Sequence, residues 1–306
     1  MKRANLSHQD KVANGIRLFG NTLIDELNYD TFIWTKEILG PDDVKIWKKT
    51  IEEEIKKGNN IYNMARLCRV GENDYLKELA SKYNVKYYDS SDPKKYDELQ
   101  VYAKTGLDGV NTKVMTIMGT SRQSGKFTTC MILKKELEKR INIGIVGTEP
   151  QSLICGIDEM VVPQTIETCH CASTIFGAVK KLDTKNRDLI IVSSQTGIFA
   201  DTLEVGTGRG GGLISIAVLF GSKPDFTILA SDSQDLEIIK KNISAIELLS
   251  GKPVIAVTLN SRCMNEENLE ESIEKMSKEL AIPVVDVLKG INLDKLINEI
   301  LLNLKN

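Results

Sequence analysis

From Lys113 onward, short apolar stretches alternate with longer stretches in which apolar residues recur every three or four positions. The short stretches are almost wholly apolar, which is typical of parallel strands buried on both faces. The longer ones are typical of amphipathic helices packed on such strands. The expected strands are 113–118, 141–146, 188–193, 225–230, 253–259 and 282–287, and the expected helices are 126–139, 163–181, 213–220, 235–249, 265–279 and 292–304. The pattern predicts an α/β fold with a mainly parallel sheet covered on both faces.

The first third of the chain follows a less regular version of this alternation. Its expected elements are helices at 41–57 and 73–83 and strands at 29–35 and 85–89. The polar run Ser90-Ser-Asp-Pro-Lys-Lys and a weakly patterned stretch from Thr105 separate it from the regular part. We therefore predict two domains, 1–110 and 111–306, a division that suits a chain of 306 residues.

The first strand of the regular part runs into the glycine-bounded segment Gly119-Thr-Ser-Arg-Gln-Ser-Gly-Lys126, and a helix follows at once. This order suits a phosphate cradle, because backbone N–H groups and the positive end of the helix then converge on one anion. Lys126 would lie against the β- and γ-phosphates of a nucleotide and be accessible to solvent without one. The alternative is an ordinary strand-to-helix turn with an exposed lysine. The residues expected to bind phosphate are Gly119, Thr120, Ser121, Arg122, Gln123, Ser124, Gly125, Lys126, Phe127, Thr128 and Thr129.

The loop departs from the usual P-loop at two positions. Thr120 stands where the first glycine is expected, because the two glycines are one residue further apart than usual. Phe127 follows the lysine, where a Ser or Thr normally ligates Mg²⁺. One residue turns a helix by about 100°, so Thr128 does not simply replace the missing ligand. Phosphate binding is well supported, and Mg²⁺ ligation stays open, with Thr128 and Glu149 as candidate ligands.

Polar residues also follow the other expected strands at the edge where parallel sheets bind ligands. Ser194 and Gln195 follow the third strand, at a position where nucleotide enzymes usually place an acid. They can hydrogen-bond to phosphate or water. Glu149 follows the second strand, and Asp158 comes shortly after it. Either acid could ligate the metal or act as general base, or be a solvated loop carboxylate.

The run Gly206-Thr-Gly-Arg-Gly-Gly-Gly212 contains five glycines in seven residues. A backbone with so few side chains could close over an anionic substrate, and Arg209 could then bind its carboxylate or phosphate. The alternative is a mobile surface loop.

The six cysteines do not form a disulfide framework in a chain of this length. The cluster Cys169-His170-Cys171 raises the question of a zinc site. It falls in an expected helix, where adjacent residues diverge by about 100°, so three consecutive side chains cannot easily ligate one ion. We expect buried structural cysteines rather than zinc.

Charge and hydropathy exclude some classes of partner. The net charge of −2 gives no bulk attraction for nucleic acid or anionic membranes. No apolar run approaches the roughly 20 residues of a membrane span, and the first residues lack the apolar region of a signal peptide. We expect a cytoplasmic protein that acts on a small molecule; self-assembly into a homo-oligomer stays open.

These motifs resemble a family of P-loop proteins formerly of unknown function that includes D-glutamate N-acetyltransferases. The resemblance covers most of the chain and rests on Gly119-Thr120, on Gly125-Lys126, on the strand that enters Ser194-Gln195, and on Leu219-Phe-Gly-Ser-Lys-Pro-Asp225. It implies an N-terminal Rossmann-like domain followed by a P-loop NTPase-type domain. The register of the loop is also similar to that of dethiobiotin synthetase, which uses ATP.

The chain departs from this family at two polar positions. Ser193 stands where the family usually has Glu, and Ser121 stands where its loop usually carries an acid. A changed set of polar groups around the same cradle indicates a diverged substrate or reaction.

Three functions therefore remain. The first is an ATP- and Mg²⁺-dependent kinase or ligase that activates a carboxylate of an amino-acid or dipeptide-like substrate. The second is an N-acyltransferase that takes acetyl-CoA and acts on a D-glutamate-like amino acid. The third is a non-enzymatic nucleotide-binding regulator. The catalytic candidates for an enzyme are Lys126, Glu149, Asp158 and Arg209.

Overall fold

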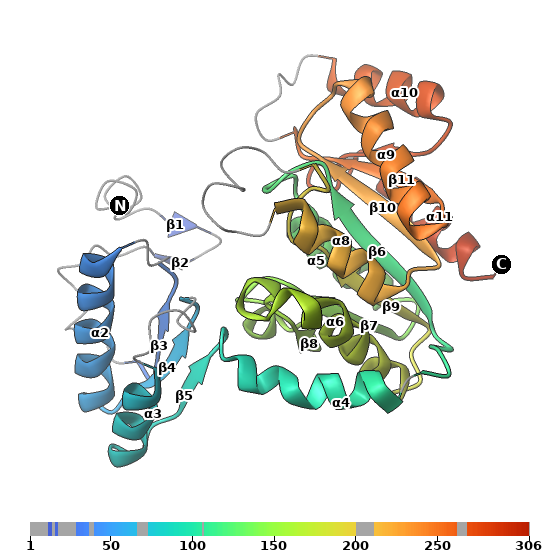
Figure 1. The fold of residues 1–306 in the computed structure, drawn as a ribbon. Helices are drawn as coiled ribbons and strands as arrows, with labels where there is room; N and C mark the ends of the chain where they lie inside the picture. The colour runs from blue at the N-terminus through green and yellow to red at the C-terminus, as the bar shows by residue number, and fades with distance from the viewer. Residues whose placement is uncertain are drawn as a thin grey trace. The chain divides into compact units, whose positions relative to one another are not determined.

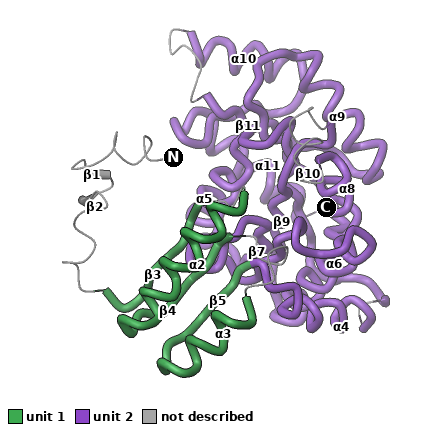
Figure 2. Tube along the Cα trace, turned by 60° about the vertical axis from the view of Figure 1, so that its left-hand side comes forward, with its two compact units in different colours: residues 1–90 green, residues 91–306 purple. Residues whose placement is uncertain are grey.

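The computed structural model describes residues 12–13, 16–17, 29–36, 40–65, 73–105, 107–199, 211–261 and 268–305. The chain divides into two compact units, residues 1–90 and residues 91–306. Figure 1 shows the order of the helices and strands along the chain, and Figure 2 colours the two units separately. Both units are built mainly from parallel strands and helices, and the first also contains the antiparallel pair β1–β2.

The first unit contains a three-stranded parallel sheet in the order β3-β4-β5. Its elements are the paired two-residue strands β1 (Val12–Ala13) and β2 (Ile16–Arg17), β3 (Thr31–Trp34), α2 (Pro41–Lys56), β4 (Asn60–Asn63), α3 (Asn73–Lys82) and β5 (Tyr87–Asp89). Helix α2 begins with proline and has acids in its first turn and Lys56 in its last, as the helix dipole favours. Trp47 and Leu76 are fully buried between helices and sheet, which fixes the core of this unit.

The second unit contains a seven-stranded sheet in the order β12-β11-β10-β6-β9-β7-β8, and its described pairings are all parallel. The strands are β6 (Lys113–Gly119), β7 (Ile143–Gly147), β8 (Glu159–Met160), β9 (Leu189–Ser193), β10 (Phe226–Ser231), β11 (Val254–Leu259) and β12 (Val284–Val285). Strand β6 lies in the middle of the sheet, between β10 and β9, so the loop that follows it is flanked by the ends of both neighbours.

Helices cover both faces of this sheet. They are α5 (Lys126–Leu137), α6 (Thr168–Asp183), α8 (Gly211–Ser222), α9 (Leu236–Ser250), α10 (Leu269–Leu280) and α11 (Leu293–Asn303), and a further helix, α4 (Asp97–Thr105), packs on α6. Ile117 packs in one core cluster with residues of α5 and α11, whereas its neighbour Met118 packs in another with residues of α8, α9 and α10. Because consecutive strand residues point to opposite faces, the two clusters lie on opposite sides. This confirms the predicted α/β fold with a mainly parallel, doubly covered sheet.

The boundary between the units lies twenty residues earlier than expected, after Ser90 rather than after residue 110. The reason is α4, which packs on α6 of the second unit. A Cβ atom added at Gly177 of α6 would lie 1.7 Å from the carbonyl oxygen of Leu99, so the two helices touch through bare backbone. Just before α4, the Tyr96 hydroxyl accepts a hydrogen bond from the backbone N–H of Val162, at 3.1 Å. Residues 91–110 therefore belong to the second unit.

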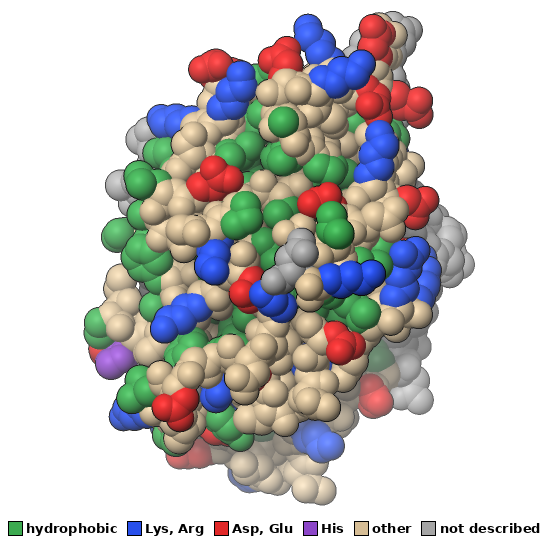
Figure 3. Space-filling model, turned by 90° about the vertical axis from the view of Figure 1, so that its right-hand side faces the viewer, with side chains coloured by type: hydrophobic (Ala, Val, Ile, Leu, Met, Phe, Trp, Pro, Cys, Tyr) green, Lys and Arg blue, Asp and Glu red, His purple; other side chains and the backbone are tan. Residues whose placement is uncertain are grey.

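The described surface carries mixed charge. On the face drawn in Figure 3, basic and acidic side chains are interspersed rather than gathered by sign. Ion pairs such as Lys139–Glu136 and Lys295–Glu274 place opposite charges next to each other. None of the helices that the structure describes is both long and apolar enough to span a bilayer.

Candidate functional site

The predicted phosphate loop connects the end of β6 to the start of α5 and depends on two glycines. Gly125 caps the helix with a φ of 99°, in the left-handed region that favours glycine. A Cβ at Gly119 would lie 2.5 Å from Ser124 Oγ and 2.7 Å from Lys126 Nζ. Gly125 therefore allows the turn into the helix, and Gly119 leaves room for the lysine amine.

Lys126 lies inside this loop. Its side chain is buried, with 4% of the residue exposed, and Nζ donates hydrogen bonds to the Ser121 carbonyl oxygen at 2.6 Å and to Ser124 Oγ at 3.2 Å. The expectation that this lysine is accessible to solvent is wrong, and so is the alternative of an exposed surface lysine. The loop instead gathers its backbone around an ammonium group, so the positive charge is already held where an anion would bind.

The ends of β10 and β11 hold the loop from the side. Thr120 Oγ1 and Ser121 Oγ donate hydrogen bonds to the two carboxylate oxygens of Asp232, at 2.9 and 2.7 Å. Asn260 Nδ2 donates to the carbonyl oxygen of Gln123 at 3.0 Å. Sequence reasoning missed Asp232. The feature that could have identified it is its position directly after β10, which pairs with β6 on the side away from β9. From the sequence, the acid usual in nucleotide enzymes is expected after β9 instead.

The end of β9 touches the loop on its other side. The Ser194 N–H donates to the Ile117 carbonyl oxygen at 2.9 Å and so continues the pairing with β6. A Cβ at Gly197 would lie 2.3 Å from the Thr120 carbonyl oxygen, so the two backbones are in direct contact. Ser194 and Gln195, which were predicted to bind the cofactor, thus lie between the paired end of β6 and the contact of Gly197 with Thr120.

Three polar atoms at the end of β9 are buried and have no hydrogen-bond partner among the described residues. They are Ser193 Oγ, Ser194 Oγ and Gln195 Oε1, in residues that are at most 6% exposed. A buried polar atom that is left unpaired costs about 1–3 kcal/mol, so such groups usually mark a ligand or an ordered water. The polar end of β9 is therefore suited to bind a group that lies next to the phosphate loop.

Glu149 lies next to Gln195. Gln195 Nε2 donates a hydrogen bond to Glu149 Oε1 at 3.2 Å, and Thr148 Oγ1 donates to the Ser193 carbonyl oxygen at 2.9 Å. These two bonds join the ends of β7 and β9. Because the amide nitrogen faces the carboxylate, the amide oxygen of Gln195 is left as an acceptor.

Asp158 does not belong to the site, which corrects its selection as a catalytic candidate. Its carboxylate accepts a hydrogen bond from the backbone N–H of Ile145 at 3.0 Å and forms an ion pair with Arg187 Nη2 at 2.9 Å. Arg187 also donates to the carbonyl oxygen of Ile143, the first residue of β7. In a parallel sheet that end of the strand is opposite the phosphate loop, so Asp158 joins the side strand β8 to the sheet.

Asp158→Asn should therefore lower stability rather than act on nucleotide binding. An amide cannot accept from Ile145 and pair with Arg187 equally well, so the free energy of unfolding should fall by about 1–2 kcal/mol. Denaturant unfolding and titration with ATP measure the two effects separately. Unchanged stability together with weakened ATP binding would return Asp158 to the site.

The first turn of α5 contains Thr128, whose hydroxyl is a candidate ligand for Mg²⁺. Phe127 packs against the core cluster under α5 and α11. Thr129 is buried and shares a hydrogen bond with Thr258, at 3.1 Å between the two Oγ1 atoms. Thr128 is half-buried. Of these three residues, Thr128 remains the candidate metal ligand.

Arg209 lies outside the described residues. The end of the glycine run is described, since Gly211 and Gly212 are buried in the first turn of α8. Thr196 Oγ1 donates to the Gly211 carbonyl oxygen at 2.8 Å and lies 2.8 Å from Ser215 Oγ. The start of α8 is thereby attached to the end of β9.

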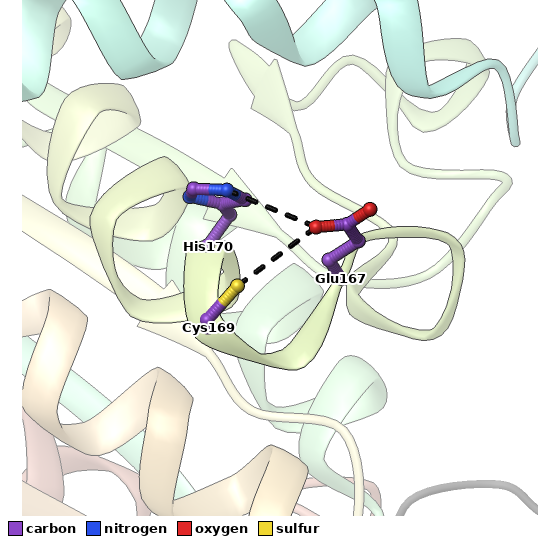
Figure 4. A group of neighbouring side chains, drawn as sticks. All are labelled: Glu167, Cys169 and His170. Carbon is purple, nitrogen blue, oxygen red and sulfur yellow. Dashed lines mark hydrogen bonds and ion pairs between the residues drawn. The ribbon is translucent and has the colours of Figure 1, made fainter.

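The cysteines near the start of α6 differ from one another. Cys171 is fully buried, and burial raises the pKa of its thiol to about 11. It is a structural cysteine, as expected. Cys169 and His170 are exposed, and they lie next to Glu167 (Figure 4). The expectation of buried cysteines is therefore wrong for Cys169.

Solved structures support the fold. A DUF1611 family protein from Anabaena variabilis superposes with a TM-score of 0.69 at 17% sequence identity, over 90% of this chain and 80% of that chain. A nucleotide-binding protein in complex with ADP from Archaeoglobus fulgidus gives a TM-score of 0.40 at 12% identity, over 60% of this chain and 84% of that one. The hydrogenase maturation factor HypB from the same organism gives 0.38 at 13%, over 67% and 97%. The last two scores are too low to establish a common overall fold.

A protein-family model matches most of the second unit. The model, described as a domain of unknown function and as the P-loop domain of DUF1611, matches residues 101–297. No curated protein matches the chain significantly. The matched region begins within α4 and includes the phosphate loop and the ends of β7, β9, β10 and β11. Since the match extends over well more than half of the sequence, the chain belongs to the DUF1611 family of P-loop proteins.

Proposed function

We propose that the protein is an ATP-dependent small-molecule enzyme that phosphorylates, and thereby activates, a carboxylate of an amino-acid or dipeptide-like substrate. The observation that carries this proposal is the ammonium group of Lys126 inside a glycine-bounded loop at the start of a helix. The buried, unpartnered polar atoms of Ser193 and Gln195 next to that loop support a second ligand group there.

Binding of the triphosphate exchanges one set of lysine contacts for another. Lys126 would leave the Ser121 carbonyl and Ser124 hydroxyl and bind the β- and γ-phosphate oxygens, while the loop N–H groups hold the remaining oxygens. Catalysis of phosphoryl transfer then rests mainly on electrostatic stabilisation of the transferring group, for which a buried ammonium is well suited.

The acids around the loop fit a magnesium ion by their chemistry. Mg²⁺ prefers oxygen ligands and usually binds one or two carboxylates together with substrate phosphates. Glu149 and Asp232 supply carboxylates at the ends of β7 and β10, and Thr128 supplies a hydroxyl. When bound, the ion would neutralise charge on the phosphates. We propose Glu149 as its main ligand or, with the ion held elsewhere, as the general base that takes a proton from the amine that captures the acyl phosphate; the substrate carboxylate itself carries no proton at neutral pH.

The substrate would approach from the end of β9. Gln195 Oε1 and Ser193 Oγ can hydrogen-bond to its polar groups, and Arg209 would bind its carboxylate. We further propose that the first unit is Rossmann-like, on the basis of its parallel strands and two helices.

One observation favours a second candidate function, an acyl-CoA-dependent N-acyltransferase on a D-glutamate-like amino acid. The two positions that usually serve a nucleotide-bound metal hold Phe127, which packs in the core, and Ser193, which is neutral and buried. Such a cradle could hold the phosphates of coenzyme A without a metal. Release of ADP on addition of amino acids supports the first function, and release of free thiol from acetyl-CoA supports the second.

Glu149→Gln should lower kcat at least about tenfold if Glu149 acts as general base, because base catalysis usually contributes more than that. ATP affinity measured without Mg²⁺ should stay near that of the wild type, since Glu149 follows β7 and is not itself part of the loop. The assay is ADP release with candidate amino acids. Glu271→Gln, which changes an exposed acid of α10, is the matched control. An unchanged kcat in Glu149→Gln would remove this residue from the mechanism.

A further inference from the structure

Three metal-binding side chains meet at the start of α6, outside the residues assigned to the phosphate site. They are Glu167, Cys169 and His170, each exposed and each offering one ligand atom, and these three atoms all lie within 4.8 Å of one another. Figure 4 shows that the Glu167 carboxylate faces both others. Its Oε2 atom is 3.9 Å from Cys169 Sγ and 3.9 Å from His170 Nε2.

The local backbone explains how these side chains converge. Cys169 and His170 are adjacent in the first turn of α6 and therefore diverge by about 100°. Glu167 is the N-cap residue and lies outside the helix, with φ −57° and ψ 135°, so its side chain can turn back over the first turn. Its carbonyl oxygen accepts a hydrogen bond from the N–H of His170 at 2.8 Å. The carboxylate thus faces two side chains that leave the helix in different directions.

Cys171 is not part of this group, although the sequence places it next to His170. Its sulfur is buried on the inner side of α6. The argument that three consecutive helical residues cannot ligate one ion holds for Cys169-His170-Cys171, but it does not apply to Glu167. The third ligand is supplied from before the helix.

The set of donor atoms selects a class of metal. A thiolate sulfur, an imidazole nitrogen and one carboxylate oxygen suit Zn²⁺ and the neighbouring divalent transition metals, whereas Mg²⁺ and Ca²⁺ prefer oxygen ligands alone. Bonds of about 2.0–2.3 Å to zinc place tetrahedral ligand atoms about 3.3–3.8 Å apart. The distances of 3.9 Å from Glu167 Oε2 to Cys169 Sγ and to His170 Nε2 are slightly longer than this range. Because the three side chains are exposed, they can rotate to shorten these distances around an ion.

We propose that Glu167, Cys169 and His170 form a binding site for one Zn²⁺ or similar transition-metal ion. Three protein ligands leave the fourth tetrahedral position open to water or to a ligand, as in zinc sites that take part in chemistry. The carboxylate and thiolate together match the charge of the ion. The site is independent of the proposed nucleotide function, because none of its residues contributes to the phosphate loop.

Titration of the reduced full-length protein with Co²⁺ tests the site directly. The wild type should bind one equivalent and develop a thiolate-to-cobalt charge-transfer absorption, which Zn²⁺ then abolishes by displacement. Cys169→Ser should remove the absorption, and His170→Ala and Glu167→Gln should each weaken Zn²⁺ binding at least about tenfold in competition with a chelator. All three side chains are exposed, so the variants should keep the wild-type circular dichroism.

Two controls make the result specific. Cys155→Ser removes another exposed cysteine and should leave Co²⁺ binding unchanged. Lys126→Ala alters the phosphate loop and should leave it unchanged as well. The proposal is overturned if the wild type shows no charge-transfer absorption, or if Cys169→Ser and His170→Ala bind Zn²⁺ as tightly as the wild type.

Discussion

Lys126→Ala is expected to weaken the binding of ATP at least tenfold, which corresponds to about 1.4 kcal/mol. The ammonium group is the one side-chain cation that the described loop holds at its centre, where it contacts Ser121 and Ser124. Without it, the loop would offer the phosphates its N–H groups, its hydroxyls and the helix end, with Arg122 as the remaining cation of the segment. Isothermal titration with ATP measures the loss, and Lys135→Ala, in an exposed position on the same helix, is the matched control.

The buried state of Lys126 adds a second expected effect. The variant removes the donor to the Ser121 carbonyl, so the free energy of unfolding should also fall, by about 1 kcal/mol. Lys135→Ala should show neither effect. Wild-type affinity for ATP in folded Lys126→Ala would contradict the P-loop interpretation, and unchanged stability would contradict the buried placement of the lysine.

Gly177→Ala is expected to destabilise the second unit by at least about 2 kcal/mol, in the upper part of the range for overpacked cores. The added methyl group would lie 1.7 Å from the Leu99 carbonyl oxygen, so α4 and α6 would have to separate. A backbone oxygen cannot move aside as a flexible side chain can. Denaturant unfolding gives the free energy, and Ser173→Ala, in the same helix, is the control.

The same variant also tests where the second unit begins. If Gly177→Ala unfolds like the wild type, α4 does not pack closely on α6, and the boundary returns to the expected position near residue 110. A large loss of stability supports a unit that starts at residue 91.

The main strands of the second unit could be predicted because they are short, almost wholly apolar runs, and its main helices because their apolar residues recur every three or four positions. Strand β8 could not, since its two residues are too few for any periodicity. Helix α4 was missed because only Leu99 and Ala103 of its nine residues are buried, and because it packs on another helix. Helix α6 begins five residues later than expected because the residues from Pro163 form a separate short turn.

The parts of the site that depend on residues close together in the sequence could be predicted. The phosphate loop is continuous, and the placement of Glu149 and Gln195 follows from the rule that parallel strands end at one edge. Asp232 depends on which strand lies beside β6, which the sequence does not state. Asp158 is near Glu149 along the chain, yet the turn between β7 and β8 brings it back beside Ile145.

The contact between Gly197 and Thr120 links the phosphate loop to the start of α8. Because backbone meets backbone there, a movement of Thr120 toward residue 197 would displace that residue. The adjacent Thr196 is hydrogen-bonded to Gly211 and Ser215, so the displacement would be passed on to the first turn of α8. Occupancy of the loop would thus be transmitted mechanically to the start of α8, and a ligand in the loop would alter the position of that helix end.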